Sequence, residues 1–63
     1  MCMAIVYSSS GSERKEAMHD VIHIEAENAG FRLTNLLGEE RCLQGKIKSI
    51  DFWQDHSVVI EQE

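Results

Sequence analysis

Residues 22–34, IHIEAENAGFRLT, have the pattern of two β strands joined by a turn. Apolar and polar residues alternate over the first five positions, which is typical of a half-buried β strand. Turn-forming residues follow at 27–30, and the alternation then resumes. Residues 17–22 would also fit one face of a helix, but the alternation favours a strand. We therefore predict a β hairpin with strands at 18–25 and 31–34.

A further strand is predicted on the amino-terminal side of this hairpin. Residues 1–7, MCMAIVY, are mostly apolar and end in residue types that favour strands. Residues 8–12, SSSGS, form a serine and glycine run that predicts a turn or hairpin loop. This run lacks the lysine of a phosphate-binding P-loop, so we do not interpret it as a nucleotide site.

The carboxyl-terminal third predicts two or three more strands. After a turn at 36–40, Leu43 and Ile47 share the parity that we assign to the core, and Ile50 breaks it. A bulge near Lys48 would restore the pattern, and such bulges are common where small sheets curl. A polar turn leads to a last strand at residues 57–61, whose residues 58 and 60 should face inward.

The fold class that follows is all-β. Five to six short strands in one domain, residues 1–63, predict a small antiparallel barrel or a curled sheet. A chain of 63 residues buries only about 60% of its unfolded surface, so its core is marginal. Small domains gain stability from disulfides, metals or oligomerisation. The two cysteines can form at most one bridge, so we expect a metal, a dimer, or both.

Charge disfavours a nucleic-acid partner. Eleven acidic residues against six basic ones give a formal net charge of −5, which repels a polyanion on average. The alternative is an RNA-binding module in which Arg32, Arg41, Lys46 and Lys48 gather on one face and Trp53 stacks on a base. The simpler interpretation of Trp53 is an anchor in the core or in an interface.

The sequence also predicts a cytoplasmic location. The first apolar stretch is far shorter than the ~20 residues of a membrane-spanning helix, and no cationic segment precedes it as in a signal peptide. We also see no combination of nucleophile, base and orienting residue. We therefore expect no enzymatic activity.

The three histidines do not predict a metal site by spacing alone. His19 and His23 are four residues apart, which on a helix would make a chelate. On the predicted strand they are about 13 Å apart, too far to share one ion. His56 lies in a predicted turn beside Asp55. Cys42 is expected to be a half-buried residue of the sheet.

Cys2 is the strongest candidate for chemistry, because it lies beside the chain's amino terminus. An α-amine has a pKa of about 7.7 to 8.0 and a thiol about 8.5, so a metal can displace both protons near neutral pH. If Met1 is removed, the amine and thiolate of Cys2 form a chelate. If Met1 remains, its amine, the Cys2 amide nitrogen and the thiolate follow in order. Nitrogen and sulfur ligands in a planar arrangement suit Ni(II) or Cu(II). One chain offers too few of these donors, whereas a symmetric dimer offers two sets.

Several stretches along nearly the whole chain resemble one family. They are MCMA at 1–4 with VY at 6–7, MHDV at 18–21, FRLTNLLGE at 31–39, GKIKSID at 45–51 and SVVIE at 57–61. Together they resemble the CooT family of small nickel-binding proteins, which have also been catalogued as predicted RNA-binding proteins.

The resemblance implies an SH3-like barrel and a cytoplasmic homodimer that binds Ni(II) at its interface through Cys2. It also implies a role as a nickel chaperone or carrier in the maturation of carbon monoxide dehydrogenase. The start of the chain is similar to hydrogenase-maturation chaperones of the HypC type as well. Those proteins carry a proline soon after the cysteine, and this chain has none.

Overall fold

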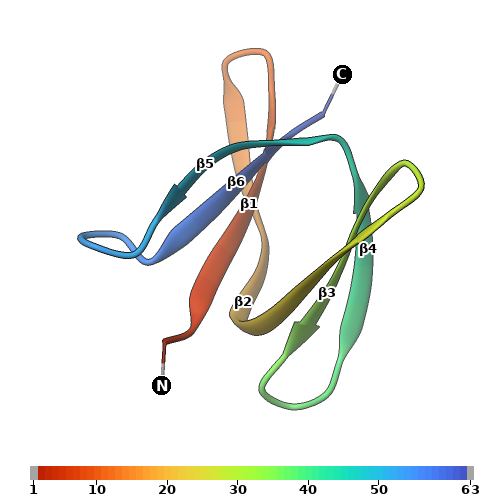
Figure 1. Cartoon of the computed structure of the whole chain (residues 1–63). Coiled ribbons are helices and arrows are strands. Elements are labelled where there is room, and N and C mark those ends of the chain that lie inside the picture. Colours follow the sequence, from red (N-terminus) through yellow and green to blue (C-terminus); the bar gives the residue numbers. More distant parts are fainter. Residues whose placement is uncertain (1, 63) are drawn as a thin grey trace.

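In the computed structural model, which describes residues 2–62, the chain forms six β strands (Figure 1). They are β1 (Ala4–Ser10), β2 (Glu13–Glu27), β3 (Gly30–Asn35), β4 (Glu40–Gln44), β5 (Lys46–Asp51) and β6 (Ser57–Glu61). Residues 2–62 contain no helix, and hence none that could cross a membrane. The predicted all-β fold class is confirmed.

The strands form one mixed sheet in the order β4-β3-β2-β1-β6-β5. β1 and β6 run parallel, and the other neighbouring pairs are antiparallel. The edge strands β4 and β5 follow each other in the chain through Gly45, and β5 crosses over β6 and β1 in Figure 1. Within the described residues no ladder joins β4 to β5, so the sheet curls but is not closed.

The long strand β2 curls the sheet because it bends in its middle. Ala4 of β1 lies opposite Val21. Two residues further along β1, Val6 lies opposite Met18, so β2 has one residue more than β1 over this interval. Asp20 lies inside the interval with a φ of +54°, a conformation that aspartate tolerates better than most residues. The amino-terminal half of β2 therefore pairs with β1, and its carboxyl-terminal half pairs with β3.

The predicted bulge near Lys48 is confirmed. Ile47 of β5 lies opposite Ile60 of β6, and Ser49 lies opposite Val59. Two steps along β5 therefore match one step along β6, and Lys48 is the extra residue. A bulge increases the local twist, which is consistent with the way β5 turns across the sheet.

The prediction of a loop at residues 8–12 is wrong for its first three serines. β1 extends to Ser10, and only Gly11 and Ser12 form the turn before β2. β2 accordingly begins at Glu13, five residues before the predicted strand. The reason is tertiary: β1 pairs with β2 on one side and β6 on the other, and pairing on both sides holds small polar residues in the extended conformation.

The core is small and lies inside the curl. Its buried apolar residues are Ala4, Val6, Val21, Leu33, Leu43, Val58 and Ile60. Residues 57–60 are all buried, including the predicted Val58 and Ile60. Trp53 is 88% exposed, so it is not a core residue. Ile47 was assigned to the core by parity but is partly exposed, because β5 is an edge strand.

Candidate metal centre

Cys2 lies at an apolar cavity of about 460 Å³. The other residues that line the cavity are Ala4, Val21, Ile22, His23, Ile24, Ala26, Phe31, Ile47, Ile50, Phe52 and Val58. The cysteine is exposed and its thiol is free. Met1, which the sequence also predicts as a ligand, lies outside the described residues. The structure thus places an accessible thiol beside a largely hydrocarbon hollow.

Backbone pairing fixes the chain just after Cys2. β1 begins at Ala4, which lies opposite Val21, and the backbone N–H of Ile5 donates to the carbonyl oxygen of His56 at 2.9 Å. Val21 itself lines the cavity, and His56 belongs to the loop that contains the lining residue Phe52. Cys2 therefore lies only two residues before a backbone position that the sheet holds in place.

The cavity presents an exposed apolar surface. Ile22, Ile47, Ile50 and Phe52 line it, and each is between 41% and 55% exposed. Solvent-exposed apolar patches of this kind mark interaction surfaces more often than isolated apolar residues do. The hollow is thus a candidate contact surface as well as the surroundings of the thiol.

His23 is the second lining residue with a metal-binding side chain. Its Nε2 lies 3.1 Å from Glu25 Oε1, and Glu25 Oε2 lies 3.4 Å from Arg32 Nη2. The hydrogen bond from His23, followed by the charge of Arg32, lowers the pKa of Glu25 below its ordinary value. The imidazole is therefore paired with an ionised carboxylate.

The donor chemistry of one chain is incomplete. Within residues 2–62 no group of three or more histidine, cysteine or acidic side chains is placed to hold a metal ion. A thiolate and an imidazole are good ligands for Ni(II), Cu(II) or Zn(II), but such sites have four or more positions. The residues fit a metal only as part of a larger donor set.

The other histidines and the second cysteine lie elsewhere. His19 lines a different cavity and faces Glu16 at 3.5 Å. His56 is in the loop between β5 and β6, with its ring centroid 6.3 Å from that of Phe52. Cys42 is exposed rather than half-buried, and its thiol lies 3.7 Å from Glu27 Oε1.

The basic residues of the RNA-binding alternative are not brought together. Arg32 lies within 4 Å of three carboxylates, those of Glu25, Glu27 and Glu40. Arg41 donates to a backbone carbonyl, that of Ala17, at 2.7 Å. Lys46 and Lys48 line two different cavities. The four side chains therefore form no continuous basic surface that would follow a phosphate backbone.

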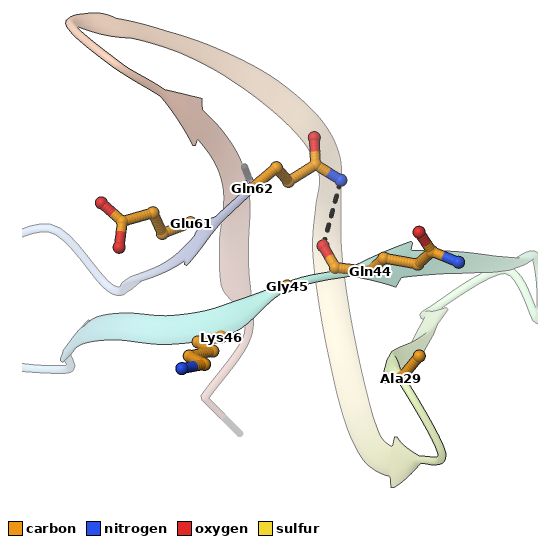
Figure 2. Close-up of a pocket in the computed structure, with 6 residues that line it drawn as sticks. All are labelled: Ala29, Gln44, Gly45, Lys46, Glu61 and Gln62. Atoms are coloured by element: carbon orange, nitrogen blue, oxygen red, sulfur yellow. Dashed lines mark hydrogen bonds between the residues drawn. The ribbon is translucent and has the colours of Figure 1, made fainter.

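A larger cavity, of about 770 Å³, has a structural explanation (Figure 2). It surrounds the link between β4 and β5, where Gln62 Nε2 donates to the carbonyl of Gln44 at 3.1 Å. Gly45 has a φ of +131°, and a Cβ there would lie 2.2 Å from the carbonyl oxygen of Glu61. This hollow shares no lining residue with the Cys2 cavity. It is where the two sheet edges approach each other.

Residues 2–62 thus form a small all-β protein with a curled six-stranded sheet. An exposed cysteine lines its apolar cavity. The family model for the CO dehydrogenase accessory protein CooT matches residues 1–61. The chain belongs to the CooT family.

The chain is also similar to two other proteins. An uncharacterized protein from Methanothermobacter thermautotrophicus is 36% identical over 63 residues, which is all of this chain and 92% of that protein. The crystal structure of a protein assigned to CooT, from Carboxydothermus hydrogenoformans, superposes with a TM-score of 0.88 over 98% of both chains. Its sequence is 24% identical, so the likeness concerns the fold.

Proposed function

We propose that this protein binds Ni(II) through Cys2 at the interface of a homodimer and carries it for the maturation of carbon monoxide dehydrogenase. The observation that carries the proposal is the exposed Cys2 thiol at the edge of an apolar cavity. Membership of a family described as a CO dehydrogenase accessory protein supports the choice of client. The choice of metal is supported by the sulfur and nitrogen donors at Cys2. Nickel is cargo here, and the protein holds it without changing it.

Two chains are needed to complete both the surface and the ligand set. The exposed isoleucines and Phe52 around the cavity would be removed from water by a second copy of the same surface. A two-fold axis there would also bring two Cys2 side chains to one place. A dimer would thus supply the missing metal ligands and add buried apolar surface to the marginal core of a 63-residue chain.

The ligands would be the two Cys2 thiolates and backbone nitrogens next to them. A planar set of nitrogen and sulfur donors suits Ni(II), although Cu(II) generally binds the same donors more tightly. Thiol and nitrogen ligands must lose protons to bind, so affinity should fall as the pH drops below neutral. Free thiols persist in the reducing cytoplasm, where we place the protein.

Calorimetric titration with Ni(II) tests the proposal on protein that carries no tag before Met1. The wild type and Cys42→Ser should bind nickel equally, because Cys42 is an exposed cysteine outside the cavity. Cys2→Ser should lose the tight site. Equal binding by Cys2→Ser would refute the proposal.

A further inference from the structure

The Cys2 cavity contains two metal-binding side chains and otherwise only hydrocarbon. Among the described residues that line it, Cys2 offers sulfur and His23 offers imidazole nitrogen, and the remaining ten are alanine, valine, isoleucine and phenylalanine. An imidazole and an exposed thiol on the wall of one otherwise apolar cavity are the side-chain types of a mixed sulfur and nitrogen metal site. The other two histidines of the chain do not line this cavity.

The pairing of β1 with β2 places Cys2 and His23 near the same end of the two strands. Ala4 lies opposite Val21 in the antiparallel pairing of β1 and β2. In such a pairing, two steps towards the amino terminus on one strand match two steps forward on the other. Cys2 precedes Ala4 by two residues and His23 follows Val21 by two, so both lie just past the same end of this ladder, and both line the cavity. The register of β2 on β3 also shifts between Val21 and His23, an irregularity of the kind that redirects neighbouring side chains.

Glu25 selects the nitrogen of His23 that is free for a metal. The carboxylate accepts a hydrogen bond from Nε2 at 3.1 Å, and Arg32 holds the same carboxylate from its other side at 3.4 Å. A proton on Nε2 leaves the lone pair on Nδ1. Metal-binding histidines commonly donate their second nitrogen to a carboxylate, which fixes the tautomer and strengthens the ligand. The side chain is 58% exposed, so the ring is accessible from the solvent.

We propose that His23 is a second protein ligand of the metal bound by Cys2, so that each subunit contributes one thiolate and one imidazole. This inference rests on the proposed function. It replaces the backbone nitrogens of that proposal with imidazole nitrogens. Two subunits would then provide two sulfur and two nitrogen donors, which fills a four-coordinate site at one metal per dimer.

The test compares His23→Ala with His19→Ala by nickel calorimetry, absorption of the thiolate-to-nickel charge-transfer band, and nickel X-ray absorption. His19 is a matched control because it lies on the same strand, is similarly exposed and also faces a glutamate. We expect His23→Ala to weaken nickel binding at least about tenfold. It should also remove the scattering typical of a coordinated imidazole ring and keep the thiolate band, whereas His19→Ala should match the wild type.

Two negative results would have different meanings. If His23→Ala keeps both the affinity and the X-ray absorption spectrum of the wild type, while Cys2→Ser loses the thiolate band, the role of His23 is refuted and the proposed function stands. If Cys2→Ser also binds nickel like the wild type, the proposed function itself is refuted. Far-ultraviolet circular dichroism of each variant establishes that the sheet is intact before the titrations are compared.

Discussion

The backbone N–H of Ile5 donates a hydrogen bond to the carbonyl oxygen of His56 at 2.9 Å. This bond connects the first paired segment after Cys2 to the loop between β5 and β6. The loop begins with Phe52, which lines the Cys2 cavity. The shape of the candidate metal centre therefore depends on how well the loop is held.

Asp51 holds this loop. Its carboxylate accepts hydrogen bonds from the backbone N–H groups of Gln54 at 3.0 Å and Trp53 at 2.8 Å, and these bonds lower the pKa of Asp51 below its ordinary value. Because the pKa is lowered in the folded state, the stabilisation is present above the ordinary pKa and is lost as the pH falls through the folded-state value. Asp51→Ala should therefore lower the midpoint of thermal unfolding at pH 7.

The difference between Asp51→Ala and the wild type should shrink when unfolding is repeated at pH values below the ordinary carboxyl pKa. Asp51→Asn, which keeps an oxygen acceptor, should lie between the two at pH 7. An Asp51→Ala protein that unfolds like the wild type at pH 7 would show that the loop is held by other contacts.

We expect Gly45 to tolerate replacement less well than Gly11. Its φ of +131° and the carbonyl of Glu61 leave no room for a Cβ, whereas Gly11, at +61°, has nothing within 4 Å. Gly11→Ala should cost about 1 to 2 kcal/mol from backbone strain alone. Gly45→Ala should cost clearly more, because the backbone of β6 must also move. Urea unfolding of both variants measures this, and equal losses would contradict it.

Asn35 is expected to stabilise the turn between β3 and β4. Its side chain is buried, its Oδ1 accepts from the backbone N–H groups of Leu37 and Glu39, and its Nδ2 donates to Glu39 Oε1 at 2.7 Å. Asn35→Ala should lower the free energy of unfolding by about 1 to 3 kcal/mol. Glu39→Gln keeps the acceptor and serves as the control. If both variants unfold like the wild type, the turn does not need this network.

In the proposed dimer, the apolar cavity is the surface through which the two subunits make contact. Ile50 lines it and is 55% exposed, so Ile50→Glu should place a charge in the interface and give a monomer in light scattering. Nickel affinity should fall with it, because the two Cys2 side chains no longer meet. Leu37→Glu is the control, since Leu37 is more exposed and does not line the cavity. A dimeric Ile50→Glu protein would place the interface elsewhere.

The sequence was sufficient to predict the strands in which apolar and polar residues alternate regularly. The hairpin of β2 and β3, the bulge at Lys48 and the inward side chains of β6 all follow from residue spacing. Ser8–Ser10 could not be predicted as strand, because these polar residues are kept extended by pairing with β2 and, for Ser8 and Ser9, also with β6. Trp53 could not be assigned to the surface, because its size alone favours burial.

Of the two candidate metal ligands, the sequence predicts one and not the other. Cys2 is apparent from its place in the sequence. His23 is not, because four-residue spacing to His19 on a strand suggests only a surface imidazole. Its relation to Cys2 depends on the register of β1 against β2, which joins residues about twenty positions apart. That register depends on the turn at residues 11–12 and on the two register shifts further along the pair, which residue spacing near His23 does not predict.

Native mass spectrometry of protein without a tag, loaded with a small excess of Ni(II), tests most directly whether two chains share one nickel ion through Cys2. We expect a species of two chains and one nickel ion, and a Cys2→Ser protein that carries no nickel. One nickel ion on each single chain, or equal nickel retention by Cys2→Ser, would contradict this expectation.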